Sequence, residues 1–168
     1  MPGFDALYKQ TITLFNRVKD RNGDDSLWYP TVIEGVHLIT SHSSSWNSRG
    51  EKETDNVRLH IRYTPSGSDA LIQCKGAAGG IVTKKWREPK VWRRMTDKEG
   101  SLTFAFGDAE AFDFFVEGVY ADFANPVSDD AYERKGFYNW MNAHFDGVYA
   151  ITQVSKFNLI PHFEIMAR

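Results

Sequence analysis

The chain is 168 residues long, carries 20 Lys and Arg against 22 Asp and Glu, and contains one cysteine. This length is typical of one domain, and a lone cysteine excludes an intramolecular disulfide framework. No apolar run approaches the roughly 18 residues of a membrane helix, and the first residues lack the basic and apolar regions of a secretory signal. We therefore expect one soluble domain, residues 1–168, made in the cytoplasm and without membrane contact.

Aromatic residues make up 14% of the chain, and the formal net charge is −2. Aromatic side chains favour strands and supply much of the binding energy of protein interfaces. A slightly acidic chain is a poor candidate for a nucleic-acid binder whose whole surface is basic. The composition therefore favours a β-rich protein that makes contacts with other proteins.

Alternating apolar and polar residues predict a series of strands separated by turns. The first strand covers residues 9–18, and Asn22-Gly23 predicts a tight reversal into a second strand over 27–40. Gly35 inside this second strand predicts a bulge. The clearest alternation is Val57-Arg58-Leu59-His60-Ile61-Arg62-Tyr63, which places basic residues and an imidazole on the side away from the core. Further strands are expected at 70–75, 81–86, 101–106, 112–120, 148–157 and 163–166.

One amphipathic helix is expected in the C-terminal half of the chain. Its apolar stripe recurs at helical spacing and consists of Phe137, Trp140, Met141, His144 and Phe145. Asp130 and Glu133 have the spacing of a capping box ahead of it. Strands with one helix predict a mainly β fold, a small β-barrel or sandwich with long loops, in which the helix covers an edge or an open end.

Residues 41–56 are expected to form a long loop, because they contain a single large apolar side chain, Trp46. Connections of this length inside a compact domain are usually functional arms or disordered segments. Two interpretations remain open. The segment is either an untethered surface loop or a loop that orders on a partner, with Trp46 as anchor and Arg49 and Lys52 as further contacts.

Sequence motifs for catalysis, cofactors or metals are missing. The glycine cluster at residues 76–80 lacks the spacing and the lysine of a phosphate-binding loop. The histidines lack the spacing of a metal-binding helix, so each is more simply a packed or surface residue. Cys74 lies in an apolar strand with Lys75 as its only cationic neighbour in sequence, which is a weak setting for an activated thiol. We therefore expect no catalytic residue, no cofactor and no metal, with a small hydrolase as a minor alternative.

Charged residues are segregated along the chain. A basic segment at 84–94, with two interleaved tryptophans, comprises Lys84, Lys85, Trp86, Arg87, Lys90, Trp92, Arg93 and Arg94. An acidic stretch over 108–134 includes Asp108, Glu110, Asp122, Asp129 and Asp130. Complementary patches on one chain favour head-to-tail contacts that close into a ring. Basic residues between tryptophans are also typical of nucleic-acid binding, so ring assembly, a solvated hairpin and nucleic-acid binding stay open, with ring assembly preferred.

Residues spread over most of the chain, from about 8 to 165, resemble a family of small proteins encoded in the head–tail gene cassette of tailed phages and prophages of Gram-positive bacteria. The N-terminal part of the resemblance lies in Thr11-Ile12-Thr13-Leu14-Phe15-Asn16-Arg17 and Trp28-Tyr29-Pro30-Thr31-Val32-Ile33-Glu34-Gly35-Val36. The C-terminal part lies in Gly136-Phe137-Tyr138 and Ile160-Pro161-His162-Phe163-Glu164-Ile165. These are structural residues rather than a catalytic signature.

The resemblance is to head-closure proteins of the head–tail joining type, and it implies a non-enzymatic virion protein, a small β-barrel with long loops that forms a ring in the neck. The implied partners are further copies of the chain, portal or adaptor proteins, and tail-terminator or tail-tube proteins, with passing contact to packaged DNA. The chain is longer than the usual joining proteins at 84–94 and 108–134, so a tail-terminator or another neck position stays open.

Overall fold

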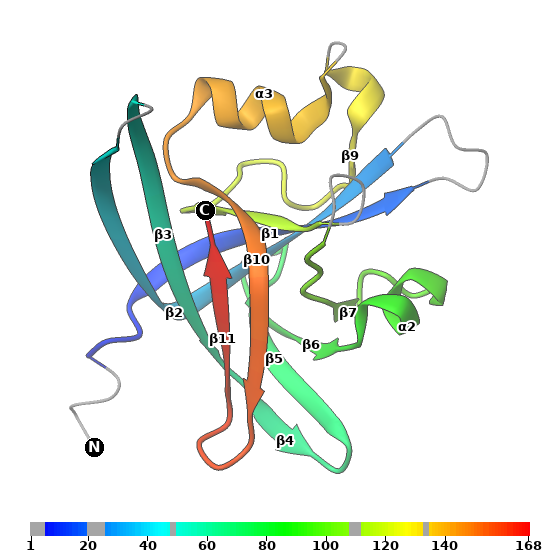
Figure 1. Cartoon of the computed structure of the whole chain (residues 1–168). Helices are drawn as coiled ribbons and strands as arrows, with labels where there is room; N and C mark the ends of the chain where they lie inside the picture. The colour runs from blue at the N-terminus through cyan, green and yellow to red at the C-terminus, as the bar shows by residue number, and fades with distance from the viewer. Residues whose placement is uncertain (1–5, 20–25, 48–49, 108–111, 133–134) are drawn as a thin grey trace.

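A computed structural model describes residues 6–19, 26–47, 50–107, 112–132 and 135–168, with the backbone alone over 42–55. Strands make up 53% of the structure, and six of them close into a β-barrel (Figure 1). The predicted mainly β fold is therefore confirmed, and the barrel is the form that it takes. None of the helices in the described ranges is long and apolar enough to cross a bilayer.

The barrel strands lie in the order β1, β8, β10, β11, β3, β2, and β2 pairs back with β1 to close the ring of strands. Every neighbouring pair is antiparallel. A short strand, β9 (Val127–Ser128), extends the sheet beside the start of β2. The barrel strands are β1 (Gln10–Lys19), β2 (Ser26–Asn47), β3 (Gly50–Arg62), β8 (Phe114–Glu117), β10 (Val148–Phe157) and β11 (His162–Ala167).

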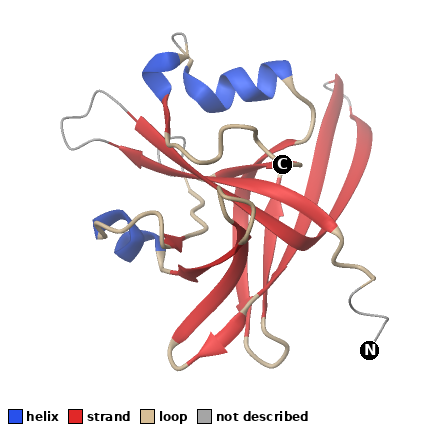
Figure 2. Ribbon diagram, turned by 180° about the vertical axis from the view of Figure 1, so that it is seen from behind, coloured by secondary structure: helices blue, strands red, loops and turns tan. Residues whose placement is uncertain are grey.

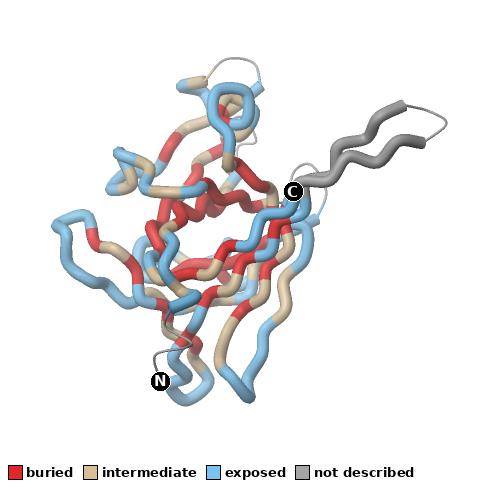
Figure 3. Tube along the Cα trace, turned by 90° about the vertical axis from the view of Figure 1, so that its left-hand side faces the viewer, coloured by how far each residue is buried: buried red, intermediate tan, exposed pale blue. Residues whose placement is uncertain are grey.

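A second sheet of four strands packs against the barrel. Its order is β4 (Thr64–Ser66), β5 (Asp69–Lys75), β6 (Ile81–Trp86) and β7 (Ser101–Leu102), and a short helix, α2 (Pro89–Arg94), lies between β6 and β7. Helix α2 was not expected from the sequence. Ile72 and Cys74 on β5 belong to the same buried cluster as Leu59 and Ile165 of the barrel, so the two sheets share one core (Figure 3).

Strand β1 is buried on both faces because a second layer lies outside it. Ile12 and Leu14 belong to the shared core, whereas Phe15 belongs to a separate aromatic cluster. In that cluster the Phe15 ring stacks on Phe114 at 4.8 Å and meets Phe137 of helix α3 (Gly136–His144) edge-on at 5.0 Å. Helix α3 lies outside the strands at one end of the molecule (Figure 2). The expected helix that covers the barrel is therefore present.

The carboxylate of Asp129 fastens α3 to β2. Its Oδ1 accepts hydrogen bonds from the indole N–H of Trp28 on β2, at 2.7 Å, and from the backbone N–H of Phe137 in the first turn of α3, at 2.9 Å. Gly136 has a φ of +79°, which side chains rarely adopt, and a Cβ there would lie 3.1 Å from the same oxygen. Glycine at this position therefore allows the close approach of the helix to Asp129.

The predicted capping box does not start α3. Asp130 lies in a single 3-10 turn, Asp129–Ala131, where the Ser128 hydroxyl accepts from the Asp130 N–H at 3.2 Å. Glu133 lies outside the described residues. The prediction failed because other side chains accept from the backbone here. Ser128 accepts from the N–H of Asp130, and Asp129 accepts from the N–H of Phe137 in the first turn of α3. The predicted apolar stripe of the helix does supply buried side chains, Phe137 and Met141.

Residues 41–56 were expected as a loop, but 41–47 and 50–56 are strand backbone. Ser41 pairs with Asn56 and Asn47 with Gly50, so β2 and β3 continue as a hairpin (Figure 1). Strand β11 ends its pairing where Ala167 meets Val57, and no other described strand pairs with residues 41–47 and 50–56. We call these two segments the hairpin arm. Local sequence gave no strand signal there because apolar and polar residues do not alternate in this segment.

The bulge predicted at Gly35 is present. The register of β1 and β2 shifts between the pairs Gln10–Val36 and Thr11–Glu34, which leaves Gly35 without a partner residue on β1. Its φ of +69° is one that glycine adopts without strain. The strands expected at 101–106 and 112–120 are shorter than predicted, as β7 and β8.

A buried carboxylate joins the segments around these shortened strands. Asp113 is 1% exposed and accepts from the Asn16 side chain at 2.8 Å, from the Arg17 N–H at 3.0 Å and from the Ala105 N–H at 2.8 Å. The Asn16 amide also donates to the Thr103 carbonyl at 2.6 Å. Asp113 thus satisfies buried backbone groups that no strand partner reaches.

Asp113→Asn is expected to destabilise the protein at neutral pH. The new NH2 group faces N–H donors, and an unsatisfied buried donor costs about 1–3 kcal/mol. We expect a loss of about 2–3 kcal/mol in the free energy of unfolding, measured by urea denaturation. The matched control is Asp130→Asn at an exposed site, which should change stability by less than about 0.5 kcal/mol. Equal effects of the two variants would contradict the role of Asp113.

The stability that Asp113 contributes is also expected to depend on pH. Burial raises the pKa of Asp113 from 3.8 to about 6, against the opposing effect of its three N–H donors. Because the folded pKa lies above the unfolded one, the part of the stability that depends on protonation of Asp113 is complete below pH 3.8 and is lost as the pH rises through about 6, whereas the hydrogen bonds from the three N–H donors remain. The difference in unfolding free energy between wild type and Asp113→Asn should therefore narrow over this range in urea titrations. If the difference in unfolding free energy widens with rising pH instead, the N–H donors lower the pKa of Asp113 by more than burial raises it.

Candidate functional site

The two tryptophans of the basic segment belong to the core. Trp92 on α2 is fully buried and meets the Tyr29 ring edge-on at 6.0 Å. Trp86 is partly buried and packs on Phe163 of β11 at 5.1 Å. The prediction of a surface with interleaved tryptophans was therefore wrong. Spacing along the chain did not reveal that both indoles turn inward to fill the space between α2, β6 and the barrel.

The predicted basic patch is divided by ion pairs and burial. The ammonium of Lys84 donates to the Thr31 hydroxyl at 2.9 Å, and burial lowers the pKa of Lys84. Asp69 binds Arg87 at 2.7 Å and Lys85 at 3.6 Å, and the hydrogen bond from Arg87 is the main cause that lowers the pKa of Asp69. The remaining cations of the segment are exposed: Lys90, Arg93 and Arg94.

The predicted acidic patch is also smaller than expected. Asp129 points inward to Trp28 and α3, and its second oxygen lies 3.5 Å from the Arg17 guanidinium. Asp122 and Asp130 are exposed. Asp108 and Glu110 lie outside the described residues. Of the five predicted acids, the described part of the chain therefore leaves two on the surface.

The predicted contact residues of segment 41–56 lie on the hairpin arm. Trp46 pairs with Glu51, and Lys52 pairs with Ser45 on the opposite strand. Arg49 and the side chains of Trp46 and Lys52 lie outside what the structure describes. The segment predicted as a contact element is therefore a strand pair with two edges, instead of a loop.

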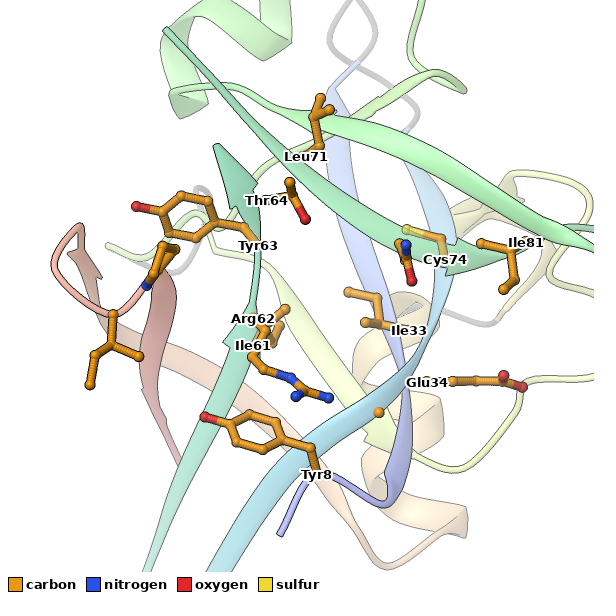
Figure 4. Close-up of a pocket in the computed structure, with 14 residues that line it drawn as sticks. Tyr8, Ile33, Glu34, Ile61, Arg62, Tyr63, Thr64, Leu71, Cys74 and Ile81 are labelled. Carbon is orange, nitrogen blue, oxygen red and sulfur yellow. The ribbon is translucent and has the colours of Figure 1, made fainter. Parts of the chain in front are cut away.

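An open cleft with a volume of about 590 Å³ separates the barrel from the second sheet (Figure 4). Ile33 and Ile61 line it from the barrel, and Leu71 and Ile81 line it from the second sheet. At one side the Arg62 guanidinium lies over the ring of Tyr8, 4.3 Å from its centroid. The polar side chains of Glu34, Thr64 and Gln73 also line the cleft, so it suits a bound segment that carries both apolar and polar groups.

Exposed apolar side chains gather beside this cleft. Leu159 and Ile160, in the turn between β10 and β11, are 97% and 60% exposed, and Ile81 on β6 is 75% exposed. Ile81 and Ile160 both line the cleft. We call these three residues the apolar rim. Large apolar side chains exposed at the margin of a cleft are typical of an interaction site.

Three histidines on neighbouring strands form a row on the outer face of the barrel. His37 pairs with His60 in register, and the rings of His37, His60 and His162 stack with centroids 5.7 and 5.6 Å apart. Glu164 lies opposite His60 on β11. Burial is the main cause that lowers the pKa of His60, and the neighbouring imidazoles act in the same direction. This row was not expected from the sequence, because only strand register brings the histidines together.

The single cysteine is not an activated nucleophile. Cys74 is 3% exposed, and its thiol donates to the Ile72 carbonyl at 3.4 Å. Burial raises the pKa of the Cys74 thiol to about 11, and the nearby Lys84 opposes this shift. The thiol therefore stays protonated at neutral pH.

Comparison with known proteins places the chain in a family but assigns no activity. No curated protein and no solved structure matches it. A family model matches residues 7–168, a range that includes both sheets, the hairpin arm and α3. The chain therefore belongs to DUF6751, a family of unknown function.

Proposed function

We propose that the chain is a structural protein of the head–tail neck of a tailed phage, of the head-closure type, and that it works as a ring of identical copies. The resemblance described above, over about residues 8–165, supports the neck assignment. The shape of the chain supports the ring, because different contact elements lie at opposite ends of one strand. A tail-terminator position is the alternative within the neck.

The hairpin arm is the observation that carries this proposal. Residues 41–47 and 50–56 pair with each other and with no other described strand. An isolated two-stranded ribbon is marginally stable in water, and its outer edges present N–H and C=O groups that another chain can pair with. The arm therefore suits a contact with a neighbouring copy, by addition of a strand or by packing along its edge.

The apolar rim supplies a second and different surface at the far end of β3. Strand β3 runs from Gly50 in the arm to Arg62, and Arg62 pairs with His162 next to the turn that carries Leu159. Two different surfaces on one chain make a head-to-tail contact, and such contacts close into a ring when the rotation between copies permits. The cleft beside the rim offers both apolar and polar lining residues to the arm of the next copy, whose sequence is polar apart from Trp46.

Many modest contacts would hold such a ring together. Burying one exposed Leu or Ile side chain contributes about 1.5–3 kcal/mol, which alone does not hold two copies together at low concentration. A closed ring repeats the contact around its circumference, and a second set of contacts to portal or tail proteins raises the effective concentration of each copy. Assembly on a partner ring is therefore favoured over free oligomers.

Oligomer formation is expected to depend on both contact surfaces. We propose to replace residues 43–54 by Asn-Gly, which leaves the pairing of Val57 with Ala167 untouched, and separately to make Leu159→Asp. Leu159→Asp should preserve the circular dichroism spectrum, and the deletion should lower only the β signal of the strand residues that it removes. Each change should weaken self-association about tenfold or more in analytical ultracentrifugation, because apolar or strand contacts are lost. Electron microscopy of the wild-type chain at high concentration should show rings.

The matched control for Leu159→Asp is Val119→Asp, which places the same charge at another exposed apolar residue, 48% exposed and outside the rim. The control should associate like the wild type. If all three variants behave like the wild-type chain, or if the wild-type chain never associates, the ring contact as described here is wrong.

The neck assignment has a separate test. Virions of the phage or prophage that encodes the chain should contain it, and antibodies against the chain should label the junction of head and tail. Loss of the gene should give filled heads and free tails that do not join. Tails of irregular length would point to the tail-terminator position instead, and virions that lack the chain would refute a structural role in the particle.

A further inference from the structure

We propose that the outer face of the barrel binds one divalent transition-metal ion of the zinc class through the imidazoles of His60 and His162 and the carboxylate of Glu164. One ligand atom from each of these residues lies within 4.8 Å of the other two. All three side chains are partly buried. The three ligand residues lie outside the hairpin arm and the apolar rim, and the site touches the rim only through the backbone carbonyl of Ile160, which binds His162.

Strand register holds the three side chains on one face. Glu164 of β11 pairs directly with His60 of β3, and His162 lies two residues before Glu164, so it projects from the same face of β11. Directly opposed residues have Cβ atoms about 4.5–5.5 Å apart, and diagonal neighbours remain within reach of long side chains. The backbone therefore fixes the spacing of the cluster, and side-chain rotation has only to complete it.

His162 is held with one ring nitrogen directed away from its own backbone. Its Nδ1 lies 2.7 Å from the Ile160 carbonyl, which can only accept, so Nδ1 carries the proton and the lone pair is on Nε2. The Phe157 ring stacks on the imidazole at 4.8 Å with an angle of 9° between the planes. A carbonyl that binds the second nitrogen of a histidine is the usual outer shell of a metal site.

Glu164 is oriented in a comparable way. The Nε of Arg58 lies 3.3 Å from Oε1 of Glu164, which leaves Oε2 to face another partner. Arg58 projects beside the cluster from β3, where it pairs with Met166. An arginine on the far oxygen fixes the carboxylate without occupying both oxygens.

The ligand types select the class of ion. Two imidazoles with one carboxylate suit Zn²⁺ and neighbouring transition metals, whereas Ca²⁺ and Mg²⁺ prefer oxygen ligands alone. With Zn–N distances of 2.0–2.1 Å, tetrahedral ligand atoms lie about 3.3 Å apart, so the side chains must close by rotation from the observed spacing. Three protein ligands leave a fourth position for water or for a group from another molecule.

The site predicts one zinc ion per chain with an affinity that depends on these residues. The full chain, freed of metals with a chelator and dialysed, would be titrated with Zn²⁺ by calorimetry and against a chromogenic chelator. His60→Gln and Glu164→Gln should each weaken binding about tenfold or more, because loss of even an outer-shell partner has an effect of this size. Co²⁺ in the wild-type chain should give the visible absorption of tetrahedral coordination, and this absorption should vanish in both variants.

The controls are two other histidines. His144 is exposed on α3, where its ring stacks on Trp140 at 4.5 Å, and His144→Gln should bind Zn²⁺ like the wild type. His37 stacks on His60 but is not among the three ligands, so His37→Gln should also retain the site. Equal loss in His144→Gln and His60→Gln, full loss in His37→Gln, or a wild-type affinity no higher than that of His60→Gln would overturn the proposal. Circular dichroism of the metal-free variants checks that each remains folded.

Discussion

The double burial of β1 is the constraint on which the rest of the structure depends. Ile12 and Leu14 enter the shared core, Phe15 enters the aromatic layer beneath α3, and Asn16 returns to the inner side to meet Asp113. Side chains alternate along a strand, so a slip of one residue would exchange the two faces. Phe15 would then meet the buried carboxylate and Asn16 would meet the phenyl rings. The register of β1 is therefore specified by both of its faces, one against the shared core and one against the aromatic layer. The pairing of β1 with β2 that closes the barrel depends on this register.

Local patterns predicted much of the fold. The strands around Val57 and Ile72, the bulge at Gly35 and the helix with Phe137 all carry their signal within a few residues, and each is present. The arm was predicted as a loop because its sequence lacks apolar alternation. Its strands pair because they continue the register that β2 and β3 have in the barrel. Helix α2 was missed because Pro89 begins only six helical residues with one buried side chain, Trp92.

The candidate site was harder to predict because it depends on which residues meet. Net charge along the chain indicated a basic and an acidic segment. It did not reveal that Asp69 forms an ion pair with Arg87 or that Asp129 accepts a hydrogen bond from the buried Trp28. The alternation at His60 showed that this imidazole faces outward. That His162 and Glu164 lie beside it requires the pairing of β3 with β11, two strands far apart in sequence.

The length of β2 has a mechanical consequence. This strand of 22 residues runs without interruption from its pairing with β9, through the barrel, to the tip of the arm. Tension applied at the tip passes along one covalent backbone and loads the hydrogen bonds to β1 and β3 in shear, many at once. A ladder pulled along its length resists far more force than one opened like a zipper from its end. The arm is thus continuous with a strand that is paired along the barrel.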